Sequence, residues 1–185
     1  MAAKTVVGIS GSLRNGSLNT MLLRAAQELA PDDVKVEIAS IRDIPLYDGD
    51  VELEHGIPAP VQALKDRVAG ASGLLLATPE YNTSIPGVFK NVIDWMSRPP
   101  ADIARVFRDR PVALMGATPG PGGTMLAHAA WLMVLRTLGM RTWNGPRLMI
   151  SRADTVFDDQ GRLKDEATRK QVQSFMAGFG RFMGA

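Results

Sequence analysis

Short apolar runs with the composition of β-strands alternate along this chain with longer segments of helical periodicity. Such alternation is typical of βαβ units, in which crossover helices join parallel strands. It therefore predicts an α/β protein built around a parallel sheet. The expected strands are Lys4–Ser10, Val34–Ser40, Ser72–Thr78, Pro111–Ala117 and Pro146–Ile150.

The segments between and after these runs predict five helices. They are expected at about Leu18–Leu29, Pro58–Ala69, Pro86–Ser97, Met125–Gly139 and Lys164–Phe182, and a long irregular connection is expected at Arg42–Ile57. The first, third and fourth strands are almost continuously apolar, as in strands that helices cover on both faces. The second strand alternates, which favours a sheet edge.

This pattern predicts a three-layer, flavodoxin-like fold with a five-stranded parallel sheet in the order 2-1-3-4-5. The length of 185 residues suits one domain, which we expect to span residues 1–185. In this topology a ligand binds at the carboxyl ends of the first and third strands, where the winding direction reverses. The loops that follow the first, third and fourth strands are therefore the ones to inspect.

The composition excludes several classes of protein. A net charge of +2 gives no reason to expect nucleic acid as a partner, and the densest basic group, Arg105, Arg108 and Arg110, is expected to be solvated. The absence of cysteine excludes disulfides and thiolate chemistry, and no His and carboxylate cluster has the spacing of a metal site. With no secretory signal and no apolar run of membrane-spanning length, a cytoplasmic location away from membranes is expected.

The loop after the first strand reads GSLRNGSLNT, Gly11 to Thr20. A helix that begins at Leu18 would direct main-chain N–H groups at an anion, and Arg14 can present a bidentate fork to a phosphate. The lysine of a nucleoside-triphosphate loop is replaced by Ser17, so a single phosphate held without metal fits better than a triphosphate. Alternatively, Ser17 is an ordinary N-cap and Arg14 is solvated.

The other two loops favour a planar ligand. The segment TPEYNTSIPGVFKNVIDW, Thr78 to Trp95, places Tyr81 as a flat aromatic surface after the third strand. The segment ATPGPGGT, Ala117 to Thr124, has glycines that let the main chain approach a ligand closely. Taken separately, the first could merely close a turn and the second could be a flexible connection, but both fall where the fold predicts a ligand.

These three segments resemble the NAD(P)H-dependent FMN reductases of flavodoxin-like fold, a family that includes chromate reductases, quinone reductases and related azoreductases. The resemblance implies an FMN site in which the first loop surrounds the phosphate and the other two line the ring system. The implied cofactor-binding residues are Ser12, Arg14, Ser17, Leu18, Asn19, Pro79, Glu80, Tyr81, Asn82, Thr118 and Gly120. The third loop departs from the usual Ser-Pro-Gly-Gly of similar proteins at Thr118 and Pro121.

The resemblance further implies an enzyme in which NADPH or NADH passes hydride to N5 of the flavin. A quinone, azo compound, metal oxyanion such as chromate, or free flavin would then accept two electrons at the same face, in a ping-pong sequence. No side chain need be catalytic. His55 is expected to be a solvated loop residue, and His128 is expected to pack on its helix. For Glu80 two roles are considered, a structural ion pair and proton transfer.

Two further expectations remain. The segment Met125–Gly139 is apolar nearly all round, which favours a subunit contact, and similar proteins are commonly homodimers or homotetramers. The alternatives to an enzyme are a flavodoxin-type electron carrier or a flavin-bound redox sensor without turnover. Carriers of that type are usually strongly acidic, whereas this chain is close to neutral.

Overall fold

A twisted parallel sheet runs through the centre of the molecule, for which a computed structural model describes residues 3–184. Its strands follow the order β2-β1-β3-β4-β5, and β6 also pairs with β4. The predicted order and the edge position of the second strand are confirmed. The strands are β1 Lys4–Ser10, β2 Val34–Ala39, β3 Gly73–Ala77, β4 Pro111–Ala117, β5 Arg141–Thr142 and β6 Leu148–Ile150.

The fifth strand differs from its prediction because it is split in two. The first part, β5, pairs with Pro111 and Val112 of β4, and β6 pairs with Met115 to Ala117 of the same strand. Trp143 N–H still donates to the Val112 carbonyl (2.8 Å), and residues 144–147 then leave the sheet. Pro146, which was predicted to open the strand, has no N–H to contribute to a ladder. The expected five-stranded sheet therefore has six strands.

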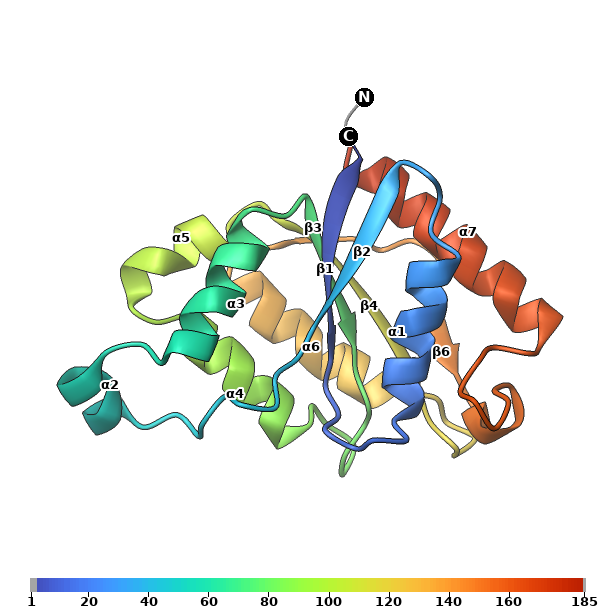
Figure 1. The fold of residues 1–185 in the computed structure, drawn as a ribbon, viewed down its shortest axis with the longest axis horizontal. Helices are drawn as coiled ribbons and strands as arrows, with labels where there is room; N and C mark the ends of the chain where they lie inside the picture. Colours follow the sequence, from blue (N-terminus) through green and yellow to red (C-terminus); the bar gives the residue numbers. More distant parts are fainter. Residues whose placement is uncertain (1–2, 185) are drawn as a thin grey trace.

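Helices cover both faces of the sheet, as predicted (Figure 1). Helices α1 (Leu18–Glu28) and α7 (Glu166–Phe182) pack on one face, around a core that includes Leu22 and Phe175. The other face has a second core, centred on Phe89 and Trp131. Its helices are α3 Ala59–Ala69, α4 Gly87–Met96, α5 Ile103–Val106 and α6 Met125–Thr137. No helix within residues 3–184 has both the length and the apolar character that a membrane crossing requires.

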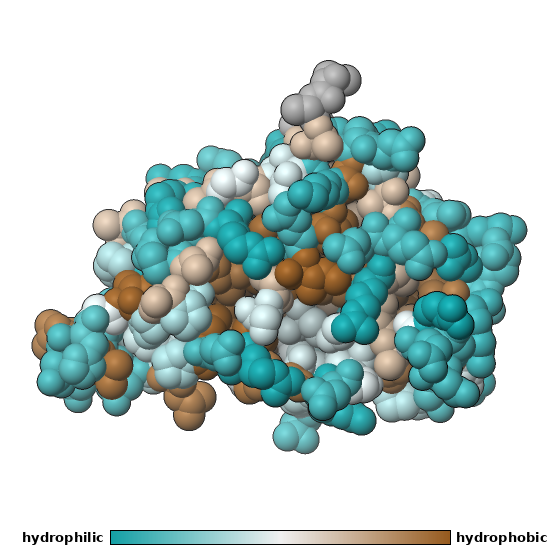
Figure 2. Space-filling model, viewed as in Figure 1, coloured by the Kyte–Doolittle hydropathy of each residue, from teal (hydrophilic) through white to brown (hydrophobic). Residues whose placement is uncertain are grey.

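The connection predicted as irregular contains a short helix, α2, at Gly49–His55. It projects from the body of the protein and buries none of its residues, and Leu53 near its end is 88% exposed (Figures 1 and 2). Two contacts hold its base: Trp95 donates to the Pro45 carbonyl, and Arg98 pairs with Glu52. The helix has no apolar face to match a core, which is why the periodicity of the sequence did not predict it.

The basic group near residue 108 is only partly solvated. Arg105 is on the surface and forms ion pairs with Asp66 and Asp102. Arg110 is half-buried and donates to main-chain carbonyls, including those of Ala71 and Val106, and burial lowers its pKa. The prediction of a solvated side chain is therefore wrong for Arg110, which ties α5 to the end of α3.

Candidate cofactor site

The three loops singled out in the sequence lie side by side at the carboxyl edge of the sheet, at the bottom of Figure 1. Loop one follows β1, loop two follows β3 and loop three follows β4. Main-chain hydrogen bonds join the strand ends: Gly11 N–H donates to the Ala77 carbonyl (2.9 Å), and Thr78 N–H donates to Met115 (2.8 Å). The fold thus brings together the segments that the topology rule selects.

Loop one ends in a helix N-terminus with a regular cap. The Ser17 hydroxyl accepts a hydrogen bond from Thr20 N–H (3.2 Å), so the N-cap that the sequence offered as the alternative is present. The N–H groups of Leu18 and Asn19 belong to the first turn, where no helical carbonyl can pair with them. Arg14, three residues before the cap, is exposed. The arrangement can hold an anion with two main-chain donors and a guanidinium.

Close packing fixes the start of loop one. Gly11 lies directly against the ring of Phe89, so closely that a Cβ on Gly11 would overlap it. Phe89 itself packs edge-on against Trp131, with 5.0 Å between ring centroids. Only glycine fits at this position, and the loop therefore leaves the sheet along one path.

Asn19 has a different place from the one predicted for its side chain. It is 3% exposed and turned inward, where its amide donates to the Ala117 carbonyl (2.8 Å) and accepts from Ala117 N–H (3.0 Å). The side chain therefore joins α1 to the end of β4. Binding of a phosphate by Asn19 is therefore still predicted, but only through its main-chain N–H.

Loop two is a tight two-residue turn. Tyr81 and Ser84 exchange both main-chain hydrogen bonds at 3.1 Å, and Asn82 and Thr83 have φ values of +49° and +61°. These angles are typical of a type I′ turn, which asparagine tolerates and a β-branched residue adopts only under strain. Tyr81 is 44% exposed at the turn, whereas Pro79 is buried. The predicted aromatic surface is therefore accessible to a ligand.

Glu80 caps a helix that belongs to another loop. Its carboxylate accepts hydrogen bonds from the N–H groups of Leu126 (2.8 Å) and Ala127 (3.0 Å), in the first turn of α6. A negative charge is favoured there by the helix dipole. Neither alternative from the sequence, an ion pair or a proton donor, describes this contact. Glu80 thus links loop two to the helix that follows loop three.

Thr78 is a positioning residue that the sequence did not reveal. It is fully buried, donates to the Pro79 carbonyl (2.9 Å) and accepts from the indole N–H of Trp131 (3.0 Å). No local signal marks it, because its partner lies 53 residues further along the chain.

Loop three is held by the segment after β6. Thr118 N–H donates to the Ile150 carbonyl (2.9 Å), and Ala153 N–H donates to the Thr118 carbonyl (2.9 Å). The Thr118 hydroxyl accepts from Gly120 N–H (3.3 Å). These contacts define the conformation at Thr118 and Gly120, in contrast to a flexible connection. Their predicted contact with a flavin stays a prediction.

The two histidines differ in environment. His55 is solvated as expected, but it lies in α2 and not in a loop. His128 lies on α6, and burial lowers its pKa to about 4, although its hydrogen bond to the Met115 main chain and the charge of Glu80 act in the opposite direction. Its buried Nε2 has no hydrogen-bond partner within the described residues. His128 is thus neutral at pH 7 and packed, as predicted.

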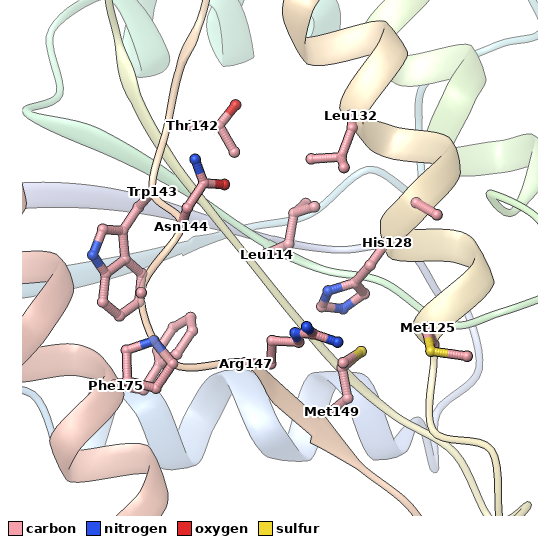
Figure 3. Close-up of a pocket in the computed structure, with 13 residues that line it drawn as sticks. Leu114, Met125, His128, Leu132, Thr142, Trp143, Asn144, Arg147, Met149 and Phe175 are labelled. Atoms are coloured by element: carbon pink, nitrogen blue, oxygen red, sulfur yellow. The ribbon is translucent and has the colours of Figure 1, made fainter.

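One cavity lies beside the interrupted fifth strand and another beside loop one. One, of about 400 Å³, opens where the fifth strand is interrupted, and its walls include His128, Trp143 and Arg147 (Figure 3). The other, of about 320 Å³, lies between loop one and β2. Its lining contains Ser12 and Arg14, which the sequence predicted, and also Arg24 and Arg42, which it did not.

The parallel sheet is doubly wound, and a capped helix N-terminus and an exposed tyrosine turn lie at its switch point. These features are typical of flavodoxin-like proteins that bind a nucleotide cofactor. The family model described as NADPH-dependent FMN reductase matches residues 5–155. The chain belongs to this family, and the predicted membership is confirmed.

Named relatives cover nearly the whole chain. The NAD(P)H-dependent FMN reductase of Pseudomonas aeruginosa is 44% identical over 168 residues, 91% of this chain and 89% of that protein. The quinone reductase of Escherichia coli K12 is 37% identical over 180 residues, 96% and 94% of the two chains. Among solved structures, FerB, a flavoenzyme NAD(P)H:(acceptor) oxidoreductase of Paracoccus denitrificans, matches with a TM-score of 0.88 and 34% identity, covering 98% of each chain.

Proposed function

We propose that this protein is an FMN-dependent NAD(P)H oxidoreductase that reduces quinones. The observation that carries the proposal is the convergence of loops one, two and three at the switch point of the sheet. The family description and the names of the P. aeruginosa and E. coli relatives support the same cofactor, donor and acceptor class.

The residues present fit an FMN. The first-turn N–H groups of Leu18 and Asn19 are suited to its terminal phosphate, with Arg14 as the charged partner. The same loop would contribute Ser12 and Ser17 at the phosphate. Pro79 to Asn82, Thr118 and Gly120 would line the ring system, with Tyr81 as the exposed aromatic surface. When bound, FMN supplies two-electron chemistry between a reduced nicotinamide and an acceptor.

The chain itself binds and orients the reactants. Glu80 is committed to the N-terminus of α6, and His128 is packed against the sheet and neutral at pH 7. The proposed function therefore requires proton transfer from neither side chain. The protein's contribution is therefore to hold the cofactor and to leave one face open, where the nicotinamide and the acceptor bind in turn.

Quinones are the acceptors that we expect to react best. Azo compounds, metal oxyanions such as chromate, and free flavin are further acceptors that we propose for the same face of the flavin. A shared face predicts ping-pong kinetics, with parallel double-reciprocal plots when NADPH and a quinone are varied together.

The decisive experiment is to purify the protein, record its absorbance spectrum after addition of FMN, and follow NADPH oxidation with and without a benzoquinone. We expect a yellow protein whose NADPH oxidation depends on the quinone. A protein that never binds FMN would refute the proposal. A yellow protein that oxidises neither NADPH nor NADH would instead favour an electron carrier or a redox sensor.

We further propose that the protein is a homodimer, or a homotetramer built from dimers. Helix α6 buries Ala127, Trp131 and Leu135 against the sheet but exposes the apolar side chains of Met125, Leu126, Leu132 and Met133. Such a face on a protein surface is typical of an interface. Replacing Met133 with Glu should shift the molecular mass measured by light scattering toward that of a monomer. An unchanged oligomer would place the interface elsewhere.

A further inference from the structure

Three arginines converge on the cavity between loop one and β2, which we call the arginine pocket. Arg14 comes from loop one, Arg24 from α1 and Arg42 from the segment after β2, and the cavity measures about 320 Å³. In Figure 2 a pale hollow lies between α1 and the lower end of β2, bordered by strongly hydrophilic side chains. The positive charge is therefore gathered at a concave surface.

A helix and a turn place two of these arginines. Arg24 lies four residues after Thr20, so both side chains line the same side of α1. Arg42 lies in the turn that follows β2, and its hydrogen bonds to the Leu13 carbonyl and Asn15 hold it beside loop one. Two different segments therefore each supply a guanidinium to one cavity.

The arginine pocket has no internal counter-charge. Among residues 3–184, no ion pair involves Arg14, Arg24 or Arg42, and no carboxylate lines the cavity. By contrast, Arg98 and Arg169 both pair with carboxylates. Within the part of the chain that the structure describes, the only hydrogen bonds of the three guanidinium groups run from Arg42 to the Leu13 carbonyl (2.6 Å) and, at 3.5 Å, to Asn15.

Neutral hydroxyl groups complete the lining. Ser12 and Ser40 lie in the wall, and the Thr20 and Ser10 hydroxyls bond to each other at 2.9 Å. Guanidinium groups with nearby hydroxyls are the donors that bind phosphate monoesters, because they offer several charge-assisted hydrogen bonds. The chemistry of the pocket therefore matches a doubly charged phosphate.

The pocket adjoins the predicted phosphate site and shares Ser12 and Arg14 with it. Its other two arginines, Arg24 and Arg42, lie outside the predicted flavin site, and no residue of Ser17 to Asn19, of loop two or of loop three lines the pocket. Neighbouring strands are about 4.8 Å apart, so roughly 10 Å separates the end of β2 from the end of β3, where loop two begins.

We propose that Arg24 and Arg42 of the arginine pocket bind the 2′-phosphate of NADPH, so that the protein prefers NADPH to NADH. The inference rests on the proposed function, since the nicotinamide must reach a flavin held by loops two and three. A dinucleotide extended from there across loop one would bring its adenosine end to the end of β2. Only NADPH carries a phosphate there, and NADH would leave the guanidinium groups unpaired.

The test measures kcat/KM of the FMN-loaded enzyme for NADPH and for NADH with one quinone. Wild type should favour NADPH, and Arg24→Ala and Arg42→Ala should each lower the NADPH-to-NADH ratio by roughly tenfold, the effect of one charge-assisted hydrogen bond. Arg24→Glu should lower it further. Arg162→Ala, which also removes an exposed guanidinium but one that does not line the pocket, should leave the ratio unchanged.

A second measurement uses competitive inhibition by adenosine 2′,5′-bisphosphate and by 5′-AMP, which differ only in the 2′-phosphate. The bisphosphate should inhibit wild type more strongly, and Arg24→Ala should abolish the difference. A wild type that binds FMN and oxidises both nicotinamides, with no loss of ratio in the variants, would overturn this inference while leaving the proposed function intact. Variants that lose FMN instead would show that the pocket holds the flavin phosphate, which also overturns it.

Discussion

The polar side chains at the carboxyl edge of the sheet fall into two groups that face opposite ways. The side chains of Asn19, Glu80 and Thr78 form hydrogen bonds with other parts of the protein, and these bonds hold the loops in place. Arg14 and Arg24, together with the exposed Tyr81, point outward without a carboxylate or hydroxyl partner among the described residues. The first group builds the shape of the site, and the second is available to a ligand. Mutations should therefore separate stability from binding.

Replacing Asn19 with Leu should have the largest effect on stability. It would leave the N–H and C=O of Ala117 buried and unpaired, at a cost of about 2–4 kcal/mol in the free energy of unfolding. Urea denaturation of the FMN-free protein should show a lower midpoint with an unchanged m-value. Asn15→Ala, an exposed change in the same loop, is the control. Equal stability of the two variants would contradict the inward role of Asn19.

His128 should make stability depend on pH. Its folded pKa of about 4 lies below the ordinary value of 6.5, so the unfolded chain binds the proton more readily between these values. Stability contributed by the neutral ring is present above pH 6.5 and is lost as the pH falls toward 4, by about 2–3 kcal/mol. His128→Leu should flatten this part of the profile of unfolding free energy against pH. If wild type and His128→Leu showed the same slope of unfolding free energy against pH, His128 would not be the cause of the pH dependence.

Arg14→Ala should act on the cofactor and not on the fold. Loss of a charge-assisted contact should weaken FMN binding roughly tenfold or more, while the urea midpoint of the FMN-free protein stays the same. Fluorescence titration of FMN measures the effect. Unchanged affinity would refute the phosphate role of Arg14.

Substitutions of Glu80 should have the smallest effect on stability, and they distinguish a structural role of its carboxylate from a role in proton transfer. Glu80→Ala should cost about 1–2 kcal/mol of stability because two N–H groups of α6 lose their acceptor, and Glu80→Gln should cost less because it keeps an acceptor oxygen. Neither variant should change the pH dependence of kcat. A new dependence on pH in Glu80→Gln would show that the carboxylate transfers a proton after all.

The sequence predicted what depends on periodicity and on local turn chemistry. Strand order, the Ser17 cap and the exposed turn at Tyr81 all follow from residues close together in the chain. It did not predict contacts between distant segments: the bonds between Asn19 and Ala117 span 98 residues, and those of Glu80 to α6 span 46 and 47. For a polar residue, type and position alone do not say whether its partner is the protein or a ligand.

The same limit explains the arginine pocket and helix α2. Arg24 and Arg42 are ordinary surface residues in the sequence, and only the packing of α1 on the end of β2 brings them together. Helix α2 has no buried residue, so its sequence has no apolar stripe from which a helix could be predicted. Both features depend on where an element lies in space, which periodicity does not encode.

The interrupted fifth strand has a practical consequence for protein engineering. Trp143 is anchored by edge-on packing against Phe175, and β6 resumes the pairing with β4 at Leu148. Between these two fixed points, residues 144–147 form one wall of the 400 Å³ cavity without belonging to the sheet. A longer or reshaped loop grafted there would alter that wall while β1, β3 and β4, which carry the three loops, keep their register. The shape of this cavity and the scaffold can thus be redesigned separately.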